Sequence, residues 1–239
     1  MTLELALILG SVFLGAFTQS LSGFGVALVT MVILPALVGI QTASPLVALI
    51  SLALELSILI IYRSSFNLGA ILPLALAAVV GIPIGVWLLG VVPEDIVITI
   101  LGIVIAGYAV YALLGIRLPA MKHPAWAYSM GFLAGILGGA YNTSGPPAVI
   151  YANCRRWAPV EFKTNLQGFF LITNIFVIAN HGLRGNLTVD VWTMFLWSLP
   201  AVALGILAGI GLGRKLSPEM FRKIVLILLV VLGLRLVFS

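Results

Sequence analysis

The apolar residues of this chain form long continuous stretches, and this feature limits its fold more than any other. An α-helix needs about 20 apolar residues to cross the roughly 30 Å hydrocarbon core of a bilayer. Stretches of that length run over residues 41–62, 69–91, 96–115, 161–181, 190–213 and 218–238. A membrane β-barrel would require apolar and polar residues to alternate, and here they do not. The sequence therefore predicts an all-α integral membrane protein.

The composition excludes several other classes of protein. Hydrophobic residues make up 62% of the 239 residues and charged residues 8%, whereas a soluble domain has roughly 25% charged residues. The single cysteine, Cys154, excludes an intrachain disulfide and leaves no Cys/His cluster for zinc, so we expect no metal site. The N-terminal stretch carries Glu4 where a signal peptide would have a basic residue, so we expect it to be retained.

Two further apolar stretches, 4–39 and 125–157, are interrupted near the middle by small and polar residues. The first interruption is Ser22-Gly23-Phe24-Gly25, and the second is Asn142-Thr143-Ser144-Gly145-Pro146-Pro147. Glycine and proline interrupt helices at such positions. Both stretches are therefore predicted to be broken helices.

The breaks also mark an internal repeat. When the second break is set over the first, small shifts align Gly81 and Gly85 with Gly205 and Gly209, and Pro93-Glu94 with Pro218-Glu219. Because these features recur in the same order, the match favours a duplication over chance. We expect one repeat over residues 1–116, a central loop over 117–124 and a second repeat over 125–239, each with a broken segment and three helices.

The basic residues predict how the two repeats face each other. If each broken segment crosses the membrane once, the repeats are parallel and the 12 Lys and Arg residues divide five against seven. If each broken segment returns to its own side, the second repeat is inverted, and only Arg184 and Arg235 lie opposite the other ten. The positive-inside rule favours the inverted arrangement, with both termini outside. Two short full spans would have the same parity, but residues 26–38 measure only about 20 Å as a helix, which favours a re-entrant hairpin.

The two breaks are the main candidates for a binding site. Unpaired backbone groups are costly in hydrocarbon, so an interrupted helix is tolerated only where it is buried in protein or lines a polar cavity. The half-helix after each break begins with unpaired N–H groups and a positive dipole end, which favour an anion. The candidate binding residues are Gln19, Ser22, Gly23, Gly25, Asn142, Thr143, Ser144, Gly145, Pro146 and Asn165, with Asn174 on the same helix as Asn165. The alternative is that each break is a kink filled by neighbouring helices.

Ionisable residues give weaker signals. Glu55 lies well inside a predicted crossing, where a charge costs roughly 2.5 to 3.5 kcal/mol on insertion scales. It is our candidate for proton coupling, and the alternative is a neutral acid hydrogen-bonded to another helix. Arg155, Arg156 and Lys163 follow the second break, where they could attract an anion or serve only to set topology. His181, near the end of its helix, is predicted to lie at the surface.

Paired glycines predict close helix packing. The pairs Gly81–Gly85 and Gly205–Gly209 are GxxxG patterns, which let helix backbones approach each other within one chain or between two copies in a homodimer. The expected partners are a small anionic substrate and the lipid bilayer. We expect no cofactor and no nucleic acid.

The motifs at the breaks also carry a resemblance. A Gly-rich break at Ser22–Ala27 runs into Leu34-Pro35, an Asn-x-Ser-Gly-Pro-Pro stretch begins at Asn142 and ends in the aromatic Tyr151, and Glu161-Phe162-Lys163-Thr164-Asn165-Leu166 follows. With these motifs, essentially the whole chain resembles the TauE/SafE sulfite exporter family, also called the toluene sulfonate uptake permease family. The family's pattern has an arginine where this chain has Lys163, so a bidentate arginine contact is not expected here.

The resemblance implies a secondary transporter of sulfite, sulfonates or similar small anions in the cytoplasmic (inner) membrane, coupled to the proton gradient. It carries a binding role over to Ser22, Gly23 and Gly25 at the first break, and to Asn142, Ser144, Gly145 and Pro146 at the second. A passive anion channel and a non-transporting membrane assembly protein are the alternatives. The sequence has no His-Glu-x-x-His, Gly-x-Ser-x-Gly or aspartyl-pair motif, so we do not expect an enzyme.

Overall fold

The computed structural model describes residues 3–62, 66–116, 118–212 and 218–238, and every regular element within them is an α-helix. The helices are α1 (Leu3–Ser22), α2 (Val26–Thr30), α3 (Pro35–Val38), α4 (Ile40–Tyr62), α5 (Leu68–Val91), α6 (Glu94–Leu114), α7 (Ala125–Tyr141), α8 (Gly145–Cys154), α9 (Pro159–Leu183), α10 (Val189–Leu212) and α11 (Pro218–Val237). Each of the six predicted crossings is a single helix, α4, α5, α6, α9, α10 or α11, which confirms that these stretches are helical.

Length and hydropathy identify candidate membrane spans. Within the described residues, six helices are long and apolar enough to cross a bilayer, namely α1, α4, α5, α6, α9 and α10. α1 was predicted only as part of a broken segment, yet it is a continuous helix of 20 residues. The chain is therefore an all-α, multi-pass membrane protein.

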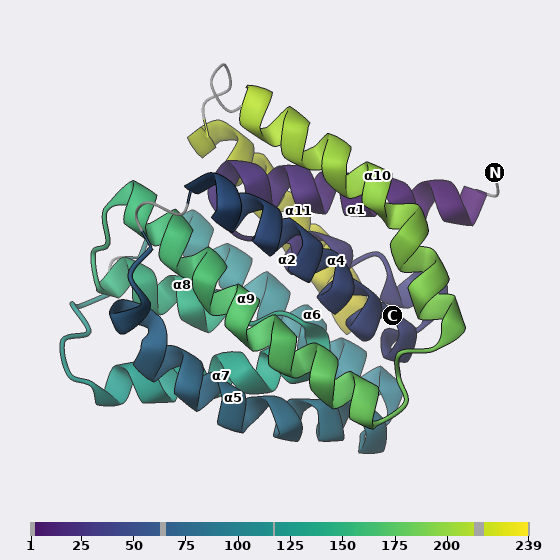
Figure 1. The fold of residues 1–239 in the computed structure, drawn as a ribbon, viewed down its shortest axis with the longest axis horizontal. Coiled ribbons are helices and arrows are strands. Elements are labelled where there is room, and N and C mark those ends of the chain that lie inside the picture. The colour runs from purple at the N-terminus through teal and green to yellow at the C-terminus, as the bar shows by residue number, and fades with distance from the viewer. Residues whose placement is uncertain (1–2, 63–65, 117, 213–217, 239) are drawn as a thin grey trace.

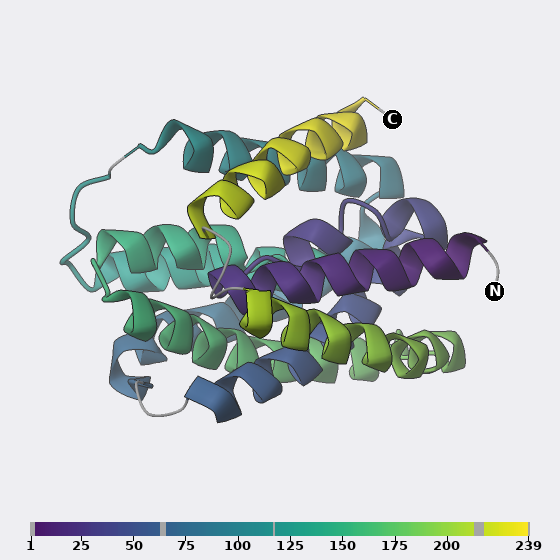
Figure 2. The ribbon, with the colours of Figure 1, turned by 90° about the horizontal axis from the view of Figure 1, so that it is seen from above.

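The helices pack in reciprocal pairs (Figures 1 and 2). α5 lies along α7, α1 lies along α10, and α6 lies along α11, while α4 contacts α9. The second unbroken helix of each predicted repeat thus packs on the first helix of the other. The N and C labels lie on the same side of the molecule in both views.

Glycines bring paired helices into backbone contact. A Cβ added to Gly81 or Gly85 of α5 would collide with carbonyl oxygens of α7. A Cβ added to Gly205 of α10 would lie 2.7 Å from the Ala16 Cβ of α1. Glycine is required at such positions because any side chain would push the two helices apart. Both GxxxG pairs are therefore used for packing within the chain.

The first break depends on two glycines in left-handed conformations. Gly23 has a φ of 88° and Gly25 a φ of 119°, values that residues with a side chain rarely adopt. The half-helix expected after this break is not continuous, because α2 has five residues and α3 four, with a turn between them. Pro35 has no N–H to donate to the carbonyl of Met31, so α2 cannot simply run on.

The second break is followed by one continuous half-helix, as predicted. α7 ends at Tyr141, and Asn142 caps it in a left-handed conformation, with its N–H donating to Gly138 O at 2.8 Å. α8 then begins at Gly145 with two prolines in its first turn, where no backbone donor is required. Its 10 residues extend for about 15 Å.

Candidate functional site

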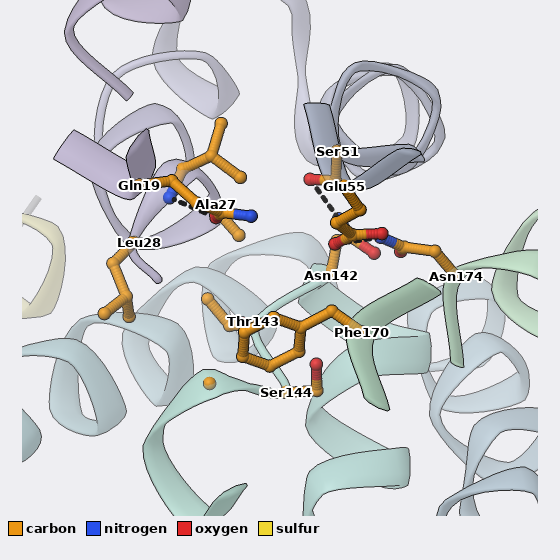
Figure 3. Close-up of a pocket in the computed structure, with 13 residues that line it drawn as sticks. Gln19, Ala27, Leu28, Ser51, Glu55, Asn142, Thr143, Ser144, Phe170 and Asn174 are labelled. Carbon is orange, nitrogen blue, oxygen red and sulfur yellow. Dashed lines mark hydrogen bonds between the residues drawn. The ribbon is translucent and has the colours of Figure 1, made fainter. Parts of the chain in front are cut away.

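The two breaks meet in one small pocket (Figure 3). It is lined by α1, α2, α4, the α7–α8 break and α9, through Gln19, Gly25, Val26, Ala27, Leu28, Ser51, Glu55, Asn142, Thr143, Ser144, Gly145, Phe170 and Asn174. The cavity measures about 20 Å³, which is close to the space that one water requires. In this conformation the cavity has room for about one water, and a larger occupant requires its walls to move apart.

Side chains of α9 hold the first break in place. Gln19 accepts a hydrogen bond from the Val26 N–H at 3.1 Å, and its amide donates to Gln167 Oε1 at 3.2 Å. Gln167 in turn donates to the Gly23 carbonyl at 2.5 Å, and Lys163 Nζ donates to the Ser20 carbonyl at 2.5 Å. Backbone groups freed by the broken helix are thus bonded by Gln19 of the same repeat and by Lys163 and Gln167 of the other.

A side chain of α4 holds the second break. Asn142 Nδ2 donates to Ser51 Oγ at 3.1 Å, and both residues line the pocket. Asn142 is 6% exposed and Ser51 1%, so each would leave a polar group unpaired if the other were lost. Each break is therefore held by an unbroken helix of the opposite repeat.

Glu55 is the carboxyl group of the pocket. Its side chain is 2% exposed, and both carboxylate oxygens accept a hydrogen bond from Asn174 Nδ2 at 2.7 Å. Figure 3 shows Glu55 and Ser51 pointing from α4 toward Asn142 and Asn174. None of the described residues that line the pocket is basic. The side chains that line the pocket offer hydroxyl and amide groups to an anion.

Comparison with known proteins shows the family. The family model named "Sulfite exporter TauE/SafE" matches residues 7–236. The chain belongs to the TauE/SafE sulfite exporter family. It is therefore a multi-pass membrane protein of a transporter family, which fits a role other than catalysis.

Two curated relatives are similar over most of their length. The "Probable inner membrane transporter protein TsaS" of Comamonas testosteroni is 26% identical over 171 residues, which are 71% of this chain and 70% of that protein. The "Probable sulfite/organosulfonate exporter TauE" of Cupriavidus necator is 23% identical over 226 residues, 92% of this chain and 88% of that protein. No solved structure matches the chain.

The residues predicted to bind the anion or to couple protons divide into two groups. Those that line the pocket are Gln19, Gly25, Asn142, Thr143, Ser144, Gly145 and Glu55. Ser22, Gly23, Pro146 and Asn165 lie outside its lining in this conformation. The Ser22 hydroxyl donates to the Thr18 carbonyl at 2.8 Å, and Asn165 Oδ1 accepts from the Asn67 N–H at 2.8 Å.

Ser51, Gln167 and Phe170 line or adjoin the pocket but were not predicted as site residues, although their spacing in the sequence is a signal. Lys163, Gln167, Phe170 and Asn174 follow one another at i, i+4, i+7 and i+11 of α9, a spacing that places them on one helix face. A polar stripe at this spacing inside a membrane helix is a signal for a face that contacts protein. Ser51 and Glu55 have the same i, i+4 relation on α4.

The prediction for His181 was wrong. Its side chain is 0% exposed, with Nδ1 2.9 Å from Asn186 Nδ2 and Nε2 3.4 Å from Ser44 Oγ. α9 contacts α4 and the chain after α9 folds back, so a residue near the end of this helix is covered. His181 is thus a buried residue with polar partners on both sides.

Proposed function

We propose that this protein is a secondary transporter of small sulfur-containing anions, such as sulfite or sulfonates, in the inner membrane. The observation that carries the proposal is that both helix breaks line one buried pocket together with a carboxyl group. The relatives' names, an inner membrane transporter and a sulfite/organosulfonate exporter, supply the location and the class of cargo. In this proposal the anion accepts hydrogen bonds from Gln19, Asn142, Thr143 and Ser144.

The two repeats of this transporter are inverted, with both termini outside. The reciprocal helix pairs support the duplication, because exchanging the repeats maps the α5–α7 pair onto the α10–α1 pair. The basic residues support the inverted arrangement, since this topology would put ten of the 12 on the inner face and only Arg184 and Arg235 on the outer. The N and C ends on one side of the molecule are consistent with the same topology.

The protein works as a carrier that opens to one side at a time. A passive channel needs a continuous path, whereas the pocket between the breaks has a volume of about 20 Å³. Movement of the breaks against α4 and α9 would admit the anion first from one side and then from the other.

Glu55 couples anion movement to protons. An anion in this pocket would lie in the same small space as the Glu55 carboxyl, and two like charges in such a space repel each other. We therefore assign the anion-bound state a protonated Glu55, so that anion and proton bind together. Asn174, which bonds both carboxylate oxygens, positions the group.

The experiment is uptake of labelled sulfite into proteoliposomes, with sulfate, sulfoacetate and chloride as competitors, with and without a pH gradient. A Cβ added at Gly145 meets nothing within 4 Å, so Gly145→Leu can fold while its side chain fills the pocket. We expect saturable flux in the native protein and its loss in Gly145→Leu. Gly107→Leu is the matched control, because Gly107 also has open space around it and lies on the exposed face of α6.

Glu55→Gln tests the coupling separately. Glutamine keeps the size of the side chain and a hydrogen bond to Asn174 but cannot exchange a proton. We expect sulfite flux that no longer responds to the imposed pH gradient. If the gradient still accelerates flux in this variant, Glu55 is not the coupling group; if no anion moves in the native protein, the transport proposal fails.

A further inference from the structure

A larger cavity lies away from the pocket, at the far end of α8. It measures about 620 Å³ and is lined by residues that include Tyr111 of α6 and Asn153, Cys154 and Arg156 at the end of α8. A second hollow of about 350 Å³ shares Cys154 and Arg156 and adds Lys122. We refer to these two hollows together as the vestibule. Its larger part falls within the size range of small-molecule sites.

The charged side chains that line the vestibule are all basic. Lys122, Arg155 and Arg156 line it, and no acidic side chain is among its lining residues in the described part of the chain. Clefts lined by one sign of charge concentrate counter-ions and raise their rate of association. The vestibule therefore favours small anions, whereas the pocket at the other end of α8 has no basic residue in its described lining.

Arg156 has a left-handed backbone conformation, which residues with a side chain rarely adopt. Its φ is 56°, at the position just after α8 where its N–H donates to the Asn153 carbonyl at 3.0 Å. Glycine or asparagine is usual at this left-handed position after a helix. An arginine in this unfavourable conformation points to a role for its side chain. That side chain lines both hollows.

We propose that the vestibule is an anion-binding antechamber, in which Arg156, assisted by Lys122 and Arg155, holds a small sulfonate or sulfite ion on its way to or from the pocket. α8 leads from the vestibule at Cys154 to the pocket at Gly145, over about 15 Å. The assignment of the ion as cargo rests on the proposed function. The presence of an anion site does not rest on the proposed function, so the site and the identity of the ion as cargo can be tested separately.

The single cysteine makes the first test independent of transport. Cys154 is 5% exposed and lines both hollows, so its rate of modification reports on their charge. The purified protein is treated with sulfonatoethyl methanethiosulfonate, which is anionic, or the trimethylammonioethyl reagent, which is cationic. Each rate is divided by the rate with a free thiol, and Cys154→Ser provides the blank. We expect at least about a fivefold preference for the anionic reagent.

Two variants test whether the Arg156 guanidinium causes the preference for the anionic reagent. Arg156→Gly suits the left-handed backbone and removes the charge, so it should fold and lose the preference. Arg156→Lys keeps the charge and should retain most of the preference for the anionic reagent. Methanesulfonate should slow modification, and chloride at the same ionic strength should not. Equal normalised rates for the two reagents, no modification by either, or an unchanged preference in Arg156→Gly would each overturn the proposal.

An anionic lipid headgroup is negatively charged, as the cargo is, so protection of Cys154 by lipid is measured in a separate experiment. If phosphatidylglycerol protects Cys154 and methanesulfonate does not, the vestibule is a lipid site and the proposal is wrong. In proteoliposomes, Arg156→Gly should raise the KM for sulfite about threefold to tenfold at low ionic strength, with Vmax unchanged and a smaller effect at high salt. A native protein without flux would refute the transport function but would leave the modification result standing.

Discussion

Replacing Gly85 with alanine should destabilise the contact between α5 and α7. An added Cβ would collide with Ile136 O, and it would lie 2.8 Å from Ala140 N and 3.0 Å from Gly139 Cα. All three are backbone atoms, so no side-chain rotation relieves the collision. The helices must separate by roughly 1 Å before the methyl group reaches an ordinary contact of about 3.5 Å.

The packing cost of Gly85→Ala can be separated from the gain in helix propensity by comparison with a second glycine-to-alanine substitution. Overpacking of this kind costs about 1–3 kcal/mol, while alanine gains up to about 1 kcal/mol over glycine in a helix. A Cβ on Gly107 of α6 meets nothing within 4 Å, so Gly107→Ala shows the helical gain alone. The difference in unfolding free energy between the two variants is then the packing cost. At about 2–4 °C per kcal/mol for a chain of this size, Gly85→Ala should unfold about 2–12 °C below Gly107→Ala.

The assay is thermal unfolding of both variants and the native protein in the same detergent, followed by tryptophan fluorescence. Displacement of α7 should also lower sulfite flux, because Gly139 and Ala140 lead directly to Asn142 in the pocket. If Gly85→Ala unfolds at the same temperature as Gly107→Ala or above it, backbone contact between α5 and α7 does not limit stability, and the reasoning is refuted.

Three further substitutions test the contacts that hold the breaks and one helix end. Gln167→Leu removes the donor to the Gly23 carbonyl, so we expect a loss of roughly 1–2 kcal/mol in stability and of most sulfite flux, both measured on the same preparation. Ser51→Ala removes the acceptor of Asn142 Nδ2 and should raise the KM for sulfite, while Ser51→Thr, which keeps the hydroxyl, should not; equal KM values would show that this bond does not shape the pocket. Asn67→Ala removes the side-chain cap of α5 and should lower the unfolding free energy by about 0.5–2 kcal/mol without changing KM, and a changed KM would place Asn67 in the transport path.

The predicted site and the lining of the pocket differ on α9, where two polar residues lie close together in sequence. Asn165 was selected, but it bonds to the Asn67 N–H outside the pocket's lining, whereas Gln167 bonds to the first break. Residues two apart on a helix face different directions. Asn174 lies seven positions after Gln167, which is about two helical turns, so these two residues share a face. The rotation of α9 about its own axis decides which polar residues meet the breaks.

The sequence by itself determined the helices and the breaks. In lipid each spanning segment must satisfy its own backbone hydrogen bonds, so a long apolar stretch specifies a helix locally, and Gly-rich or Pro-rich interruptions specify where it stops. The six predicted crossings and the position of both breaks follow from this rule.

Only the tertiary structure decided which side chains meet. The Glu55–Asn174 pair, the burial of His181 and the vestibule around Arg156 join residues from helices far apart in sequence. Such contacts depend on how closely glycines let the helices approach and on how each helix is turned about its axis. Lipid is as apolar as the side chains that face it, so the apolar pattern specifies that a helix crosses but not which face meets protein.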